Sequence, residues 1–279
     1  MKIADIETRK GDKIVATIFE SQLNDHVIII AGAMGTKQKF YSRFAEFTST
    51  QGITVITFDY TGIGQSLTKP ISTIQCNVWD WGKSDLELVI AFAKENYPAK
   101  KISLVGHSVG GQLIGLAPSS VQAHKIILVA AQSGYWKFWP GIFKYFLWAN
   151  WNALFPFLTK TFNYMPSKYF SGMEHLPYNV ARQWSKWCTS SNYLFDELES
   201  EHLYFHKIKA TIYSYSVEDD NYAPKKAVDW LSEKFKNSNV VRVHLQRSQL
   251  KKNHIGHFGF FKDMFKDDLW KDFIKNVKE

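Results

Sequence analysis

The sequence predicts an α/β fold, with a mostly parallel sheet, helices on both of its faces and an inserted helical cap. Short apolar, β-branched runs alternate along the chain with segments of helical periodicity. One of these runs leads into a serine flanked by glycines, Gly106-His-Ser-Val-Gly110. The alternation breaks once, at Gln132, where an aromatic-rich segment begins. These three observations favour one core interrupted by one insertion.

Two runs of alternating polarity, Ile3–Thr8 and Ile14–Phe19, open the chain and predict a hairpin. Short, mainly apolar runs follow, as expected for strands that are covered on both faces. In chain order, these predicted buried strands are Val27–Ala31, Thr54–Phe58, Ile102–Val105 and Ile126–Ala130. Strand character returns at Ala210–Ser216 and Val240–Leu245, after the aromatic segment.

Helical periodicity fills most of the gaps between these strands. The predicted core helices are Phe40–Gln51, Trp79–Tyr97, a helix after Ser108, Pro224–Phe235 and His257–Val277. Residues 1–131 and 207–279 are therefore predicted to form the core, and residues 132–206 the cap. Prolines interrupt the cap segment at Pro156, Pro166 and Pro177, so we expect several short helices there.

Composition and charge argue against several functional classes. The net charge is +8, but Lys and Arg are interleaved with Asp and Glu, which does not favour a nucleic-acid partner. The two cysteines, Cys76 and Cys188, lie far apart without metal-ligand spacing, so free thiols and no metal are predicted. The N-terminus does not resemble a signal peptide, and no apolar run approaches about 20 residues. A cytoplasmic protein is the expectation.

Glycines after the second buried strand raise the question of a nucleotide cofactor. Gly62-Ile-Gly64 follows that strand, but Leu67 stands where the third glycine of a dinucleotide-binding motif belongs. We interpret these glycines as a tight turn and predict no cofactor.

The Gly106–Gly110 segment fits the pattern of a nucleophile elbow, in which a strand turns sharply into a helix at the central serine. Small residues two positions before and after Ser108 let neighbouring backbone pass without a clash. A serine hydroxyl is a poor nucleophile at neutral pH, so it needs a base, and the base needs an orienting carboxylate.

Candidates for the acid and the base follow the last two strands of the predicted sheet. Glu218, Asp219 and Asp220 come after Ala210–Ser216 and are the candidate acids. His254 and His257 come after Val240–Leu245 and are the candidate bases. The order serine, acid, histidine is the order of elbow-bearing hydrolases.

Over nearly its whole length the chain resembles the α/β-hydrolase superfamily, and in particular a branch of predicted bacterial serine hydrolases. Besides the elbow, the resemblance rests on Asp80-Trp-Gly82, Ser133-Gly-Tyr-Trp136 and Gly256-His257. It implies Ser108 as the nucleophile, Asp220 as the carboxylate four residues before Pro224, and His257 as the base.

The resemblance also implies an oxyanion hole made of two backbone N–H groups, one of them from Val109. The other belongs to Ala33, with Met34 as the alternative, in the loop after the first buried strand. This sequence has Ala31-Gly32 where the family has His-Gly, and Thr61 where an arginine is common. A backbone donor tolerates any side chain, so the hole is expected to survive the change.

Eight of the fourteen residues between Tyr135 and Trp148 are aromatic. We predict that they pack as a cap over Ser108, with Tyr135, Trp136 and Trp139 lining an apolar substrate pocket. The alternative is an interfacial membrane anchor, because Lys137 and Lys144 accompany the rings. Contact with a membrane surface is the less favoured of the two.

Together these features predict a cofactor-free serine hydrolase that cleaves a small carboxylic ester with an apolar portion. Thioesterase, peptidase or acyltransferase activity on the same triad is an alternative, because all of them share an acyl-enzyme. A non-catalytic member of the fold that binds a ligand or a partner is the alternative from another functional class.

Overall fold

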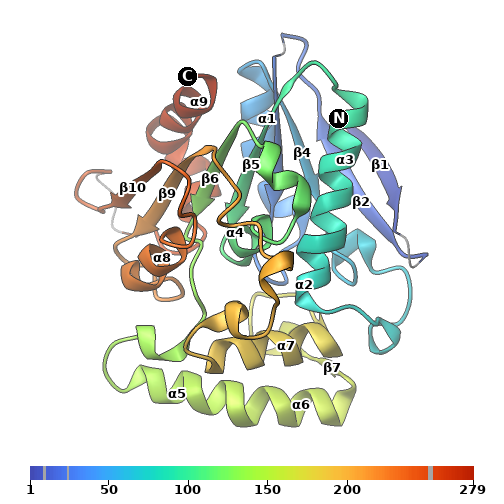
Figure 1. The fold of residues 1–279 in the computed structure, drawn as a ribbon, viewed down its shortest axis with the longest axis vertical. Coiled ribbons are helices and arrows are strands. Elements are labelled where there is room, and N and C mark those ends of the chain that lie inside the picture. Colours follow the sequence, from blue (N-terminus) through green and yellow to red (C-terminus); the bar gives the residue numbers. More distant parts are fainter. Residues whose placement is uncertain (9–10, 24, 251–253) are drawn as a thin grey trace.

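An eight-stranded sheet runs through the molecule (Figure 1). The computed structural model describes residues 1–8, 11–23, 25–250 and 254–279. The second strand pairs antiparallel with both of its neighbours, and all the other pairs are parallel. The strand order is β1 (Lys2–Glu7), β2 (Lys13–Phe19), β4 (Ile53–Phe58), β3 (His26–Ala31), β5 (Lys101–His107), β6 (Lys125–Val129), β9 (Thr211–Val217) and β10 (Val240–Leu245).

The predicted fold class is confirmed. The opening hairpin is the antiparallel pair of β1 and β2, and each predicted buried strand forms within two residues of its expected bounds. Residues on β3 show why these strands are continuously apolar. Val27 and Ile29 belong to one hydrophobic core, and Ile28 and Ile30 belong to another on the opposite face. The centre of the sheet is therefore buried on both sides, whereas the edge strands β1 and β10 are partly exposed.

Helices cover the two faces in separate layers. On one face lie α3 (Glu87–Asn96) and α4 (Val109–Ile114), and on the other lie α1 (Ser42–Thr50) and α9 (Lys271–Lys278). The helix predicted at Trp79–Tyr97 forms as α2 (Val78–Asp80), a π-helical turn at Trp81–Leu86, and α3. The remaining core helix is α8 (Lys225–Ser232), which packs against β9.

The predicted helix over His257–Val277 is wrong in its first half. Regular helix begins only at a π-helical turn, Lys266–Trp270, which continues into α9. The carbonyl of His257 accepts a hydrogen bond from the His107 ring at 3.0 Å, instead of serving a helical N–H further along the chain. A long-range contact has therefore replaced the local helix.

The cap segment lies below the sheet in Figure 1, at the end that carries the elbow. Its helices are α5 (Phe143–Ala149), a π-helical turn (Asn150–Leu154), α6 (Phe155–Phe162) and α7 (Tyr178–Thr189). A two-residue pair, β7 (Tyr164–Met165) with β8 (Leu176–Pro177), also forms here, although no strand was predicted in this segment. Within the described residues, no helix has the length and apolarity needed to cross a membrane.

The order of the strands changes direction between β3 and β5. From β3 the chain crosses to β4 on one side, whereas from β5 it crosses to β6 on the other. In open α/β sheets, ligands bind outside the carboxyl ends of the strands at such a switch point. Here that point lies between Ala31, at the end of β3, and Ser108, just after β5.

Candidate active site

Ser108 occupies the sharp turn between β5 and α4. Its backbone has φ 54° and ψ −120°, a conformation that residues with a side chain rarely adopt. The turn requires glycine beside it, because a Cβ on Gly110 would collide with the carbonyl oxygen of Ala31. A Cβ on Gly106 would likewise meet the backbone of Gly111. The hydroxyl of Ser108 makes no hydrogen bond to any residue that the structure describes.

Asp220 and His257 form a buried pair. The Nδ1 of His257 donates to Oδ2 of Asp220 at 2.7 Å, and both side chains are almost fully buried. The other carboxylate oxygen of Asp220 accepts from the N–H groups of Tyr222 at 2.8 Å and Ala223 at 3.0 Å. The carboxylate is thus held by its own loop, and it orients the imidazole so that Nε2 is the nitrogen left to accept a proton.

Asp219, the neighbouring carboxylate, contacts the separate loop that leads into His257. It accepts hydrogen bonds from the N–H groups of Ile255 and Gly256, each at 3.0 Å, and from the exposed His254 ring at 2.5 Å. Partial burial opposes ionisation, but these three donors outweigh it and lower the pKa of Asp219. Asp219 therefore anchors the chain that leads into His257, while Asp220 contacts the His257 ring.

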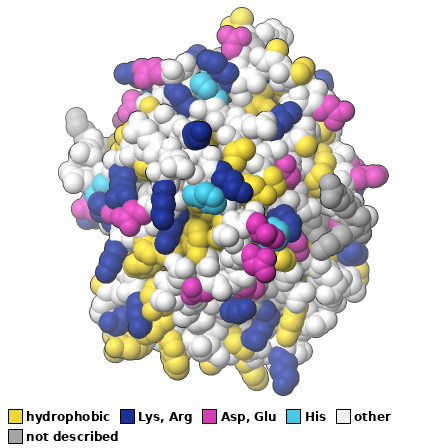
Figure 2. All heavy atoms as spheres, in the orientation of Figure 1, with side chains coloured by type: hydrophobic (Ala, Val, Ile, Leu, Met, Phe, Trp, Pro, Cys, Tyr) yellow, Lys and Arg dark blue, Asp and Glu magenta, His cyan; other side chains and the backbone are white. Residues whose placement is uncertain are grey.

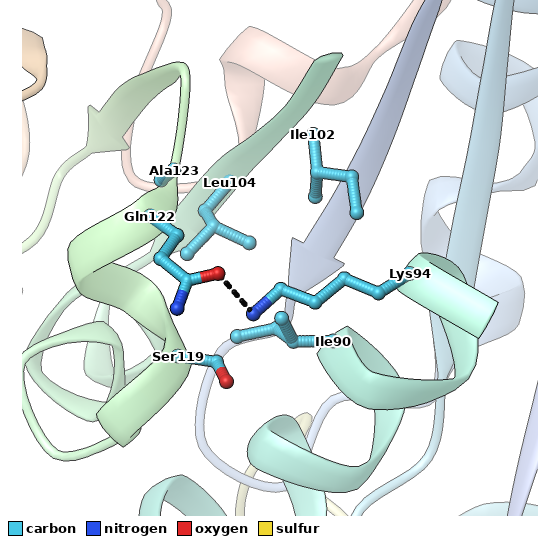
Figure 3. A pocket seen from close by; sticks show the side chains of 7 residues that line it. All are labelled: Ile90, Lys94, Ile102, Leu104, Ser119, Gln122 and Ala123. Carbon is cyan, nitrogen blue, oxygen red and sulfur yellow. Dashed lines mark hydrogen bonds between the residues drawn. The ribbon is translucent and has the colours of Figure 1, made fainter. Parts of the chain in front are cut away.

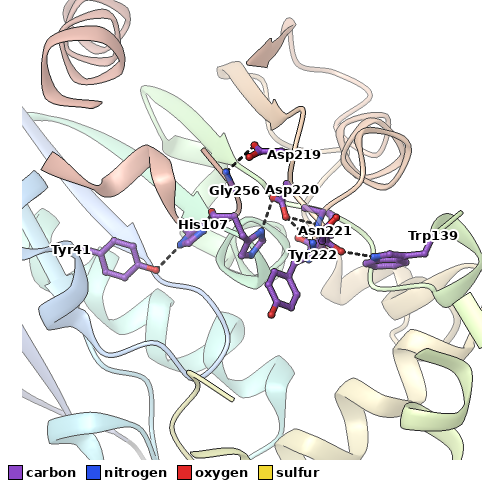
Figure 4. A network of polar contacts seen from close by, with 11 residues as sticks. Tyr41, His107, Trp139, Asp219, Asp220, Asn221, Tyr222 and Gly256 are labelled. Carbon is purple, nitrogen blue, oxygen red and sulfur yellow. Dashed lines mark hydrogen bonds and ion pairs between the residues drawn. The ribbon is translucent and has the colours of Figure 1, made fainter. Parts of the chain in front are cut away.

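His107, which precedes Ser108, links the elbow to two other parts of the site (Figure 4). Its Nε2 donates to the carbonyl of His257, so its Nδ1 accepts from the hydroxyl of Tyr41 at 2.8 Å. Burial, reinforced by His257 nearby, lowers the pKa of His107 well below its usual value, so the ring is neutral. The ring is also packed against the ring of His257, with centroids 5.1 Å apart.

Tyr41, which contacts His107, also accepts a hydrogen bond from one of the expected oxyanion donors. The N–H of Ala33 donates to the oxygen of Tyr41 at 2.9 Å. That donor is engaged inside the protein, which speaks against the expectation that it faces a substrate. The N–H of Met34, the alternative, has no partner among the described residues. Val109 begins α4, so its N–H has no partner within the helix either.

The cap reaches this site through Trp139. Its ring is buried, and its Nε1 donates at 2.8 Å to the carbonyl of Asn221, the residue after Asp220 (Figure 4). Tyr135 and Trp136 are half-buried and pack edge-on against each other, with ring centroids 6.1 Å apart. Of the three predicted pocket residues, Trp139 is therefore the one that contacts the loop of the candidate acid.

Thr61, which stands where the family has an arginine, contacts a buried carboxyl group. Its N–H donates to Asp85 at 2.8 Å, and its hydroxyl lies 3.2 Å from the other carboxyl oxygen. Burial raises the pKa of Asp85 to about 7, against the effect of these two hydrogen bonds. No cation pairs with Asp85 among the described residues.

Two other features of the described chain lie apart from these residues. A small pocket borders α3, and its polar contact is between Lys94 and Gln122, at 2.9 Å (Figure 3). Three surface side chains, Glu199, Glu201 and His202, have ligand atoms close enough together for a metal ion. Neither feature includes a predicted site residue. Cys76 and Cys188 are both buried.

Sequence reasoning missed Tyr41 and the anchoring role of Asp219. Tyr41 lies 66 positions from the histidine that it contacts, and no local pattern marks such a pair. The sequence presents Asp219 as a rival acid, because adjacent carboxylates in one loop look equivalent until their partners are known.

Comparison with known proteins agrees with this architecture. The family model Hydrolase_4, described as serine aminopeptidase, S33, matches residues 22–227. No protein of curated function matches the sequence significantly.

Solved structures match over almost the entire chain. The esterase EaEST from Exiguobacterium antarcticum is 16% identical with a TM-score of 0.62, and 99% of each chain is covered. A soluble variant of monoglyceride lipase from Saccharomyces cerevisiae is 13% identical with a TM-score of 0.71, covering 99% of this chain and 94% of that one. Est1E from Butyrivibrio proteoclasticus, solved with ferulic acid, is 14% identical with a TM-score of 0.60, covering 99% and 100%.

Because these solved structures are so low in sequence identity, their likeness shows only that the fold is shared. The family model also indicates the class of reaction, which is hydrolysis. Because that model spans most of the chain, the protein belongs to the serine aminopeptidase S33 family of α/β-hydrolases and is a hydrolase.

Proposed function

We propose that the protein hydrolyses a small carboxylic ester through a triad of Ser108, His257 and Asp220. Two observations carry this proposal: the buried hydrogen bond between His257 and Asp220, and a serine in a strained elbow whose neighbour, His107, packs against the His257 ring. The contact between His107 and the His257 carbonyl supports it, because it ties the elbow to the loop of the base.

In the proposed reaction, Ser108 Oγ attacks the ester carbonyl carbon while Nε2 of His257 takes the hydroxyl proton. Asp220 holds the imidazole in the required tautomer and stabilises the imidazolium. The imidazolium then gives its proton to the departing alkoxide, which leaves an acyl-enzyme on Ser108. Water, deprotonated by the same imidazole, releases the carboxylic acid and restores the serine hydroxyl.

For the oxyanion we propose the N–H groups of Val109 and Met34. The engagement of the Ala33 N–H by Tyr41 supports Met34 over Ala33. Removing one such donor from a serine hydrolase typically costs about 3 kcal/mol of transition-state stabilisation.

An ester is favoured over an aminopeptidase substrate by the charges near the site. An aminopeptidase needs a carboxylate to receive the free ammonium group of its substrate. No Asp or Glu occurs between Glu95 and Glu174, a stretch that includes the elbow and most of the cap. Glu174 itself lies beside the loop at Gly35 and already pairs with Lys37, at 3.1 Å.

We further propose that the cap, residues 132–206, supplies the apolar side of the substrate pocket through Tyr135, Trp136 and Trp139. The contact of Trp139 with the Asp220 loop supports this. Thioester hydrolysis and acyl transfer would use the same acyl-enzyme.

The test begins with a fluorophosphonate probe, which requires an activated serine. Wild-type protein should be labelled, and the Ser108→Ala variant should not. His257→Ala should abolish ester hydrolysis, whereas the matched control, His254→Ala, should retain most of it because that ring is exposed. Equal labelling of wild type and Ser108→Ala would refute the triad. Faster turnover of aminoacyl p-nitroanilides than of p-nitrophenyl esters would refute the ester assignment.

A further inference from the structure

The outer side of the cap is an unusually apolar surface. We use the name outer cap face for six residues of α5, α6, the π-helical turn between them and the position just before α5: Ile142, Phe143, Phe146, Leu154, Phe157 and Phe162. All six side chains are exposed, Ile142 by 85% and Phe157 by 66%. Large apolar residues gathered on one exposed element usually mark an interaction site.

These side chains point away from the core because the inner side of the same helix is already occupied. Trp151, Phe155 and Thr159 are buried, and they follow one another at intervals of four residues. An α-helix has 3.6 residues per turn, so such a series would drift around its axis. The π-helical turn at Asn150–Leu154 adds a residue and keeps the series facing inward. The outer residues are thereby held on the opposite side.

The charged residues of the segment that forms the outer cap face all have one sign. Lys144 and Lys160 lie within α5 and α6, and Lys137 precedes them. None of the three makes an ion pair with a described residue. Because the sequence has no acidic residue between Glu95 and Glu174, no carboxylate interrupts this arrangement along the chain. In Figure 2, the lower edge of the molecule, where Figure 1 has α5 and α6, carries apolar and basic side chains.

We propose that the outer cap face docks on an anionic lipid surface. Exposed aromatic and aliphatic side chains enter the boundary between headgroups and acyl chains, while the lysines contact lipid phosphates. A second copy of the chain fits less well, because a two-fold contact through this face would oppose lysine to lysine. This reverses the preference drawn from the sequence, in which the aromatic segment served the cap alone. The structure assigns it both roles, with Trp139 and Trp151 turned inward and Phe146 and Phe157 outward.

The first experiment measures co-sedimentation with vesicles of phosphatidylcholine alone, and of phosphatidylcholine with 30% phosphatidylglycerol. All proteins carry Ser108→Ala, so that lipid hydrolysis plays no part and the result does not depend on the proposed reaction. We expect strong binding to the anionic vesicles, weaker binding to the neutral ones, and a loss of binding as salt is raised. The triple variant Ile142→Ser, Phe146→Ser, Phe157→Ser should bind at least about tenfold more weakly.

A matched control removes three exposed apolar side chains elsewhere, with Ile3→Ser, Leu23→Ser and Met264→Ser. It should bind vesicles like the parent protein. When the two triple variants are made with Ser108 retained, both should hydrolyse a water-soluble ester as the wild type does. This activity also shows that they are folded. A second variant, Lys144→Gln with Lys160→Gln, should lose the preference for anionic vesicles while retaining binding to neutral ones.

Three results would overturn the proposal. The first is that the parent protein binds neither kind of vesicle. The second is that the outer-face variant and the control variant bind equally. The third is that the parent is a dimer in solution which the outer-face variant makes monomeric, without vesicle binding, because the face would then be a contact between two copies.

Discussion

Two adjacent carboxylates, Asp219 and Asp220, have different partners in this site. Asp220 contacts the His257 ring, whereas Asp219 contacts the backbone leading to it. We expect Asp220→Asn to reduce kcat/KM on a p-nitrophenyl ester by about 10⁴-fold, because the amide favours the wrong imidazole tautomer.

Asp219→Asn replaces an acceptor oxygen with a donor opposite the N–H of Ile255 or Gly256, which loosens the loop. The expected loss of kcat/KM is about tenfold to a hundredfold. A smaller effect from Asp220→Asn than from Asp219→Asn would reverse the two roles.

Asp85 makes the free energy of unfolding depend on pH. Burial raises its pKa to about 7 in the folded state, whereas in the unfolded chain the carboxyl ionises near pH 4. Between these values the folded state holds a proton that the unfolded state has released, so the stability from this group is complete below about pH 4 and falls until about pH 7.

Asp85→Asn should remove this dependence, since an amide can accept from the N–H of Thr61 and donate to its hydroxyl. The difference in Tm, variant minus wild type, should increase by several degrees as the pH is raised from 5 to 8. Parallel curves of Tm against pH for the two proteins would contradict the raised pKa.

At the scale of elements, the elbow depends on the close approach of β3 to the start of α4. A methyl group at Gly110 would meet the carbonyl oxygen of Ala31 and the backbone of Gly32, neither of which can rotate away. Gly110→Ala should cost about 1–3 kcal/mol and lower Tm by several degrees. The control is Gly172→Ala, where a Cβ would meet no atom within 4 Å. An unchanged Tm for Gly110→Ala would mean that the elbow relaxes.

At the scale of the whole molecule, the cap and the core meet at the proposed pocket. If the aromatic residues of the cap line it, each methylene added to the acyl chain buries apolar surface worth about 0.8 kcal/mol. The value of kcat/KM for p-nitrophenyl esters should then rise about three- to fourfold per methylene from acetate to hexanoate. A flat or falling series would show that the rings of Tyr135 and Trp136 pack against each other and leave little room.

The sequence by itself determined the fold class, the order of the strands along the chain and the motif of the elbow. These features depend on neighbours in sequence. The strands β3 and β4 are fully buried runs rich in β-branched residues, and a local turn needs the glycines around Ser108. It also narrowed the candidate acid and base to a few residues in two loops. Their catalytic roles stay predictions, to be decided by the kinetic tests above.

Only the tertiary structure decided which atoms meet. Asp219 and Asp220 differ in their partners, although both lie in one loop. Ala33 gives its N–H to Tyr41, a contact that depends on how a loop and a turn pack. The helix expected at His257 does not form there, and the His257 carbonyl instead accepts a hydrogen bond from His107, 150 positions away. The aromatic cap divides into buried and exposed rings according to the direction of its helix. In each case the deciding partner is distant in the sequence, so no local pattern encodes it.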